Sequence, residues 1–212
     1  MKSTFLTAIL SLFISMASAF APDPPAGTGT AGDPYQIATL DHLYWLSQNS
    51  AEWVAGKYFI QTADIDASAT STWFDNGAGG YYGFPIIGGN SNIVGNHIAG
   101  TCSGNYNGQG YSISNIYINR SPVQVAIFGR CVAATIQNLR IVNPVVISGP
   151  SGNEAAILVA RSALAVPTTL TNVHIIGGSL TSSNLYIGAM LGWGIAAATN
   201  CTTSATVNQT AG

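Results

Sequence analysis

Two carboxylates stand one residue apart in the first half of the sequence, Asp64 and Asp66. Alternate residues of a β-strand point to the same side, so this pair could ligate a hard cation such as calcium if other oxygen ligands completed the site. Neither a second carboxylate cluster nor a glycine-rich calcium nonapeptide accompanies the pair. We therefore favour a turn-stabilising role, with calcium as the weaker hypothesis and no other cofactor expected.

Residues 71–99 hold the densest group of aromatic side chains after the N-terminal segment, set among glycine and asparagine. Exposed rings on a loop can stack against sugar rings through their apolar faces. The candidate ligand-binding residues are Trp73, Tyr81, Tyr82 and Phe84. The alternative is that these rings close the side or end of the fold as core. We favour packing and keep glycan binding as the functional hypothesis.

Catalytic groups are scarce in the second half of the sequence. Glu154 is the only acidic residue after Asp75, whereas glycoside hydrolases use a pair of carboxyl groups. The sequence has no His-Glu-x-x-His, Gly-x-Ser-x-Gly or phosphate-binding glycine loop. We assign no catalytic residue, and a polysaccharide lyase or hydrolase based on residues 71–99 stays open as an alternative. The arginines near predicted strand ends are expected to keep strand edges soluble rather than clamp a substrate; they are Arg120, Arg130, Arg140 and Arg161.

The charge of the chain excludes one class of partner. Charged residues make up 7% of the sequence and the formal net charge is -2, which is too small and of the wrong sign for nucleic-acid binding. A surface with so few charges must be wetted by hydroxyls and amides. This composition fits an extracellular solenoid better than an ordinary enzyme.

Residues 1–19 have the pattern of a signal peptide. Lys2 precedes an apolar run over residues 5–16, and the small residues Ala17-Ser-Ala19 follow it. This run is too short to span a membrane, and no later segment is long and apolar enough. We expect a secreted or surface-located protein without a transmembrane segment. Residues 20–33 read as a Pro/Gly/Thr linker.

The elements that must position these side chains are predicted by an internal repeat. An apolar residue, a spacer and an asparagine recur at Asn115, Asn138, Asn172 and, more loosely, Asn200. A second small and apolar element separates them, at residues 126–129, 156–160 and 189–192. No unit has enough apolar surface to fold alone, so the units must stack.

The repeated asparagines themselves invite two interpretations. Amides aligned on one face could bind ice or a glycan. We favour a structural ladder, in which asparagines at the same turn of successive coils hydrogen-bond to one another and to the backbone.

The repeat units resemble those of the GLUG-repeat proteins of bacterial surfaces. The segments that carry this resemblance are residues 107–119, 127–129, 134–139 and 186–192, with weaker likeness at 32–37 and 63–67. The resemblance implies an all-β fold, a short right-handed parallel β-helix (solenoid), of the kind found in secreted adhesin-like proteins. We place the repeats in residues 100–212. Residues 34–99 form the N-terminal cap and aromatic loop region, and a helix from Thr39 to Asn49 covers the first coil.

Three cysteines allow at most one disulfide within the chain. Cys102 and Cys131 are the favoured pair, because one repeat spacing can bring positions on successive coils together. Cys201 takes the repeat position of an inward apolar residue, and we expect it to be part of the core.

The sequence as a whole predicts a secreted or surface-attached, non-catalytic β-helix that binds a glycan or another component of a host or cell surface, with adhesion as its role. A carbohydrate-active enzyme on the same fold is the alternative from a different class. A purely structural stalk, or a fragment of a larger surface protein, is the third.

Overall fold

The computed structural model describes residues 22–89, 98–121, 124–150 and 153–210. The predicted signal peptide lies outside these residues. Strands dominate the described chain, and its one α-helix, α2 (Leu40–Gln48), lies near the N-terminus. Two short 3-10 helices accompany it, η1 (Ser50–Glu52) and η2 (Ser68–Thr72). No helix within these ranges is long and apolar enough to cross a membrane.

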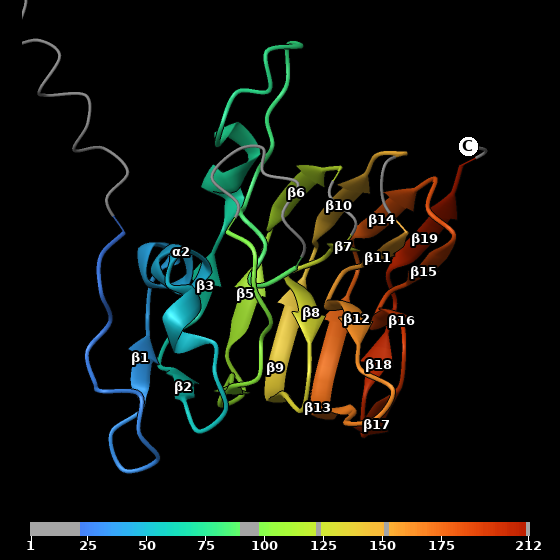
Figure 1. Cartoon of the computed structure of the whole chain (residues 1–212). Coiled ribbons are helices and arrows are strands. Elements are labelled where there is room, and N and C mark those ends of the chain that lie inside the picture. The colour runs from blue at the N-terminus through green and yellow to red at the C-terminus, as the bar shows by residue number, and fades with distance from the viewer. Residues whose placement is uncertain (1–21, 90–97, 122–123, 151–152, 211–212) are drawn as a thin grey trace, which may run out of the picture.

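The strands form parallel sheets that run along a stack of coils (Figure 1). The first sheet follows the order β1 (Tyr35–Ile37), β2 (Tyr58–Gln61), β4 (Asn105–Asn107), β9 (Thr135–Val142), β13 (Thr168–Ile176) and β17 (Ala196–Thr199). The same sheet also contains β3 (Ile65–Asp66), β5 (Ser112–Ser114) and β18 (Thr202–Thr203). Of these, β3 pairs with β5, β5 also pairs with β9, and β18 pairs with β13.

Three smaller sheets complete each coil. One contains β6 (Tyr117–Arg120), β10 (Val145–Ser148), β14 (Ser179–Ser182) and β19 (Thr206–Gln209). Another contains β7 (Gln124–Val125), β11 (Glu154–Ala156) and β15 (Tyr186–Gly188). The last contains β8 (Phe128–Cys131), β12 (Val159–Ser162) and β16 (Leu191–Trp193). The expected all-β architecture, a short parallel β-helix with a small N-terminal helical cap, is confirmed.

Inward side chains of successive coils stack in columns. Ile113, Ile141 and Ile175 occupy paired positions on β5, β9 and β13, and each is almost fully buried. The same arrangement repeats on every sheet, because parallel pairing in register places like positions side by side. Each coil therefore completes the core of its neighbours, as the lack of apolar surface in a single repeat requires.

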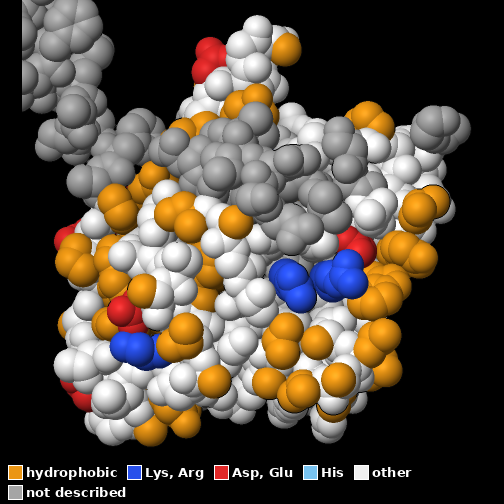
Figure 2. Space-filling view, in the orientation of Figure 1, with side chains coloured by type: hydrophobic (Ala, Val, Ile, Leu, Met, Phe, Trp, Pro, Cys, Tyr) orange, Lys and Arg blue, Asp and Glu red, His pale blue; other side chains and the backbone are white. Residues whose placement is uncertain are grey.

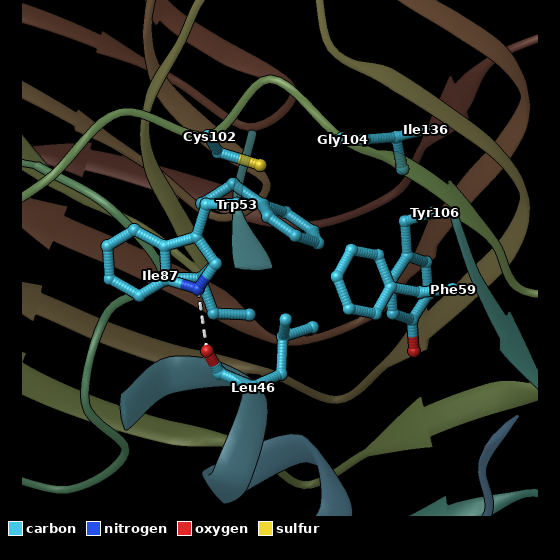
Figure 3. Close-up of a pocket in the computed structure, with 9 residues that line it drawn as sticks. Leu46, Trp53, Phe59, Ile87, Cys102, Gly104, Tyr106 and Ile136 are labelled. Atoms are coloured by element: carbon cyan, nitrogen blue, oxygen red, sulfur yellow. Dashed lines mark hydrogen bonds between the residues drawn. The ribbon is translucent and has the colours of Figure 1, made fainter. Parts of the chain in front are cut away.

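The helix α2 covers the N-terminal end of this core (Figure 1). Thr39 caps it, its hydroxyl accepting a 3.2 Å hydrogen bond from the backbone N–H of His42. The buried face of α2 packs Leu43 and Leu46 into the core, and the Trp53 indole N–H donates to the carbonyl of Leu46 at 2.6 Å (Figure 3). The cavity between cap and first coil has a volume of about 10 Å³, which leaves no room for a ligand.

An asparagine ladder lines one corner of the coils. The side-chain Nδ2 of Asn138 donates to Oδ1 of Asn107 at 3.1 Å, that of Asn172 to Asn138 at 3.0 Å, and that of Asn200 to Asn172 at 2.9 Å. Asn138, Asn172 and Asn200 have φ values of 52°, 54° and 52°. Asparagine tolerates this left-handed conformation better than other side-chain-bearing residues, so it can bend the chain here and bond to the next coil.

Asn115 lies outside this ladder, which corrects its expected place. It is also left-handed, with φ 58°, but it occupies the following corner and donates to Oδ1 of Asp66 at 3.1 Å. The cause is that the apolar-x-Asn motif occurs at two corners of a coil. Ile113 and Ser114 pair with Ile141 and Val142, so Asn115 corresponds to Asn143, with φ 49°, and not to Asn138. Asn107 takes the ladder position of this coil.

Replacing Asn138 with alanine should lower the free energy of unfolding by about 2–4 kcal/mol. The loss combines two amide hydrogen bonds, about 1 kcal/mol each, with the cost of a left-handed alanine, about 1–2 kcal/mol. Asn138→Gly removes the same bonds without that conformational cost, so it should recover about 1 kcal/mol relative to alanine. Urea denaturation of the three proteins measures this. Equal stability of wild type and Asn138→Ala would show that the ladder contributes nothing.

Candidate functional site

Residues 73–83 of the aromatic segment form a hairpin that extends beyond the coils, closed by an antiparallel bridge between Asp75 and Tyr81 (Figure 1). At its base the rings pack on the cap. The Trp73 ring lies 5.3 Å from that of Tyr44 and 6.4 Å from that of Phe84, and Phe84 is fully buried. Among the candidate ligand-binding residues, Phe84 therefore belongs to the packed interior, and the half-buried Trp73 packs against it.

The other two aromatic candidates lie higher on this hairpin. Tyr81 is 38% exposed, and the ring of Tyr82 lies 5.7 Å from the guanidinium of Arg120. Arg120 is buried and donates to the backbone carbonyls of Gly83 at 2.7 Å and Phe84 at 2.9 Å. Burial lowers its pKa to about 10, which leaves it charged at neutral pH. Arg120 thus ties the hairpin to β6, rather than keeping a strand edge soluble as expected.

Asp64 and Asp66 bind protein groups instead of converging on a common point. Oδ1 of Asp64 accepts from the backbone N–H of Ser112 at 2.7 Å, and this hydrogen bond lowers its pKa. Asp66 accepts from Asn115 and from the backbone N–H of Ser68, which lower its pKa as well. Within the described ranges, no three His, Cys, Asp or Glu side chains are grouped as metal ligands would be.

Cys102 and Cys131 form a parallel bridge pair on successive coils, where the repeat spacing places them. Both thiols are buried and free. A hydrogen bond between them lowers the pKa of the Cys102 thiol and raises the pKa of the Cys131 thiol. The disulfide itself stays a prediction. Cys201 is partly buried against the core.

A second group of side chains lies on the outer face of β8, β12 and β16. Arg130, Arg161 and Trp193 occupy paired positions on these three strands and project away from the core. With Ala163, Leu164 and Ala165 they line an open hollow of about 300 Å³. Figure 2 shows two basic side chains beside an acidic one at this place, with hydrophobic side chains around them. We call this the Arg–Trp hollow.

The central arginine of the Arg–Trp hollow is held from two sides. Its guanidinium lies over the indole of Trp193, 4.3 Å from the ring centroid. Nη1 of Arg161 also donates to Oε1 of Glu154 at 2.9 Å. Glu154 is only 3% exposed, and its Oε2 accepts from Gln124 at 2.9 Å. The buried Glu154 carboxylate accepts two hydrogen bonds and so holds Arg161 in place. Arg161 in turn packs against one face of the Trp193 indole and holds the ring in position.

Sequence reasoning did not bring these residues together, although a signal existed. Arg130, Arg161 and Trp193 each directly follow the second repeat element, after Gly129, Ala160 and Gly192. Equivalent positions of a parallel β-helix lie side by side on one face. The column combines two arginines with a tryptophan, so it is visible only when the repeat register is known.

The Arg–Trp hollow combines the features that sugar-binding sites use. A fixed indole offers an apolar surface for a sugar ring, and guanidinium groups donate hydrogen bonds to its substituents. Leu164, 56% exposed, extends the apolar rim. The shallow groove along the asparagine ladder is less suited to binding, because its amides already bond to one another.

Comparison with known proteins gives one partial likeness. No family model matches the chain, and no solved structure matches it. The chain is similar to halomucin of Haloquadratum walsbyi, with 34% identity over 170 residues, which cover 78% of this chain. The chain spans only about 2% of the length of halomucin.

Replacing Phe84 with alanine should lower the free energy of unfolding by about 3–5 kcal/mol, because the ring is fully buried in the packed base of the hairpin. Tyr81→Ala, on the exposed part of the same hairpin, should change it by less than about 1 kcal/mol. Chemical denaturation of both variants tests the assignment of these rings. A stable Phe84→Ala protein with altered glycan binding would restore Phe84 as a ligand-binding residue.

Acid should weaken the corner that Asp64 and Asp66 hold. Their pKa values in the folded protein lie below the ordinary 3.8, so their contribution is complete above that pH and is lost as the pH falls through the folded values. The double variant Asp64→Asn/Asp66→Asn should therefore lose less stability than wild type between neutral pH and the acid range. Denaturation midpoints across a pH series measure the difference, and parallel curves would contradict this role.

Proposed function

We propose that this chain is a secreted or surface-exposed β-helix module that binds carbohydrate without converting it, and that the Arg–Trp hollow is its binding site. The observation that carries this proposal is the indole of Trp193. One of its faces lies on Arg161, which Glu154 fixes in place. The strand that carries it, β16, is the edge of its sheet, and no described strand pairs with its other side.

The β-helix fold and the partial likeness to halomucin support an extracellular setting. The name of that relative places it among mucins. Low charge and a surface rich in hydroxyls and amides suit a protein that meets polysaccharides in solution. Adhesion through such contacts is the role that we infer for the module.

The carboxylates around the hollow favour binding over hydrolysis. Glycosidases use two carboxyl groups about 5–9.5 Å apart on either side of the scissile bond. Glu154 is the acidic residue bonded to the hollow, and both of its oxygens are occupied by Arg161 and Gln124. No second carboxylate of the described chain lines the hollow. This arrangement is suited to holding a side chain, not to transferring a proton.

We also infer that the repeats are GLUG repeats. Supporting this, Phe128 and Leu191, from segments 127–129 and 186–192 that carry the resemblance, occupy corresponding places on β8 and β16, each paired with Val159. The adhesin-like role of GLUG proteins agrees with a binding module.

Trp193→Ala should weaken carbohydrate binding at least about tenfold, because stacking on an aromatic face contributes a large part of sugar affinity. Affinity electrophoresis of residues 20–212 through gels that contain neutral or acidic polysaccharides measures this. Trp193→Phe should retain most of the binding, and Tyr81→Ala is the control for an exposed ring elsewhere.

Assays for reducing and unsaturated ends in the same polysaccharides should give none above background. Release of such ends, lost in a Glu154→Gln variant, would favour the enzyme alternative. Unchanged retardation of Trp193→Ala would remove the Arg–Trp hollow as the site.

A further inference from the structure

The two arginines of the Arg–Trp hollow differ in charge balance. Arg161 is neutralised by Glu154, at 2.9 Å, and is therefore a fixed and compensated group. Arg130 is exposed, and none of the ion pairs of the described residues includes it. All eight acidic side chains of the sequence lie in the described ranges, and none of them pairs with Arg130. The hollow carries one uncompensated positive charge.

From these charges we propose that the Arg–Trp hollow selects acidic saccharides, with Arg130 binding the carboxylate or sulfate group of the sugar. This inference rests on the proposed carbohydrate-binding function and adds the class of ligand. The planar guanidinium can bind either anion through two parallel hydrogen bonds, which neutral sugars cannot accept with the same strength.

Pairing in register makes the position of Arg130 favourable for an anion. Arg130 lies directly opposite Arg161 on the neighbouring strand, and like charges so placed repel each other. Glu154 offsets this repulsion at Arg161, with which it forms an ion pair, but it forms none with Arg130, which keeps its positive charge uncompensated. An anion bound at Arg130 would remove the remaining repulsion between the two arginines. Anion binding would therefore also stabilise the pairing of β8 with β12.

The spacing across the hollow sets the size of the ligand. Trp193 and Arg130 lie on β16 and β8, which are separated by β12 and thus by two strand spacings, about 9.5 Å. Arg161, on the strand between them, covers one face of the Trp193 indole, so a sugar ring stacked on the free face lies farther still from Arg130. The geometry points to a chain of at least three sugars that lies across the strands, with one ring on the free face of Trp193 and the acidic group of a later ring at Arg130.

The test compares three trisaccharides at pH 7 and low salt by isothermal titration calorimetry. They are trigalacturonic acid, its neutral methyl ester and a sulfated galactotriose. Wild type should bind at least one of the acidic sugars about tenfold or more tightly than the ester, and added salt should reduce this preference. The acidic sugar that binds more tightly identifies carboxylate or sulfate as the natural group.

Arg130→Gln should remove the preference for the acidic sugar, because the affinity for that sugar falls about tenfold and the affinity for the ester falls much less. Arg140→Gln is the matched control, since it removes the same charge from an exposed arginine outside the hollow. Trp193→Ala should weaken binding of acidic and neutral sugars alike. Circular dichroism of each variant checks that it is folded.

The outcomes separate this inference from the proposal on which it rests. Equal binding of acidic and neutral sugars, lost only in Trp193→Ala, would overturn the acidic specificity and leave carbohydrate binding in place. A preference for the acidic sugars that persists in Arg130→Gln would also overturn it. Failure of all three sugars and of the polysaccharide panel would overturn the proposed function itself.

Discussion

The left-handed corner of each coil is the constraint on which the structure depends. A residue there must accept a positive φ and must also hold the next coil in place. Asn138, Asn172 and Asn200 meet both demands, since each amide donates to one coil and can accept from another. Because the coils are held in register at this corner, the strands of every sheet also pair in register. Inward side chains therefore align as the columns of the core, and outward side chains of β8, β12 and β16 align as the Arg–Trp hollow.

Because the protein has few charged residues, each of them has a larger effect on the structure around it. Arg120 serves the interior, where it bonds to the backbone of the aromatic hairpin, and Glu154 serves the hollow from a buried position. Neither arrangement is an ordinary surface ion pair, whose contribution to stability is small. In both cases a buried charged group orients a neighbouring aromatic segment. The free-energy cost of burying that charge is offset by hydrogen bonds on more than one side of the group.

The sequence predicted the fold because the repeat spacing and the shortage of apolar residues per unit together require stacking. It identified Asn138, Asn172 and Asn200 for the same reason. Asn115 was misplaced because the apolar-x-Asn motif occurs at two corners of a coil, and the local sequence does not reveal to which corner a copy belongs. The hollow was missed because Trp193 shares the position of Arg130 and Arg161 without sharing their chemical type. Arg120 was misread because its burial depends on a distant hairpin that covers it.

The position of the Arg–Trp hollow across three successive coils also affects how the stack opens. In a linear array each unit contacts only its neighbours, so coils can open one after another. Trp193 belongs to β16, whereas Arg130 lies two strands away on β8. A saccharide that joins these two residues would link coils that otherwise open separately. Ligand occupancy would then make their opening cooperative, so that the linked coils behave as one rigid body when the protein is attached to its target.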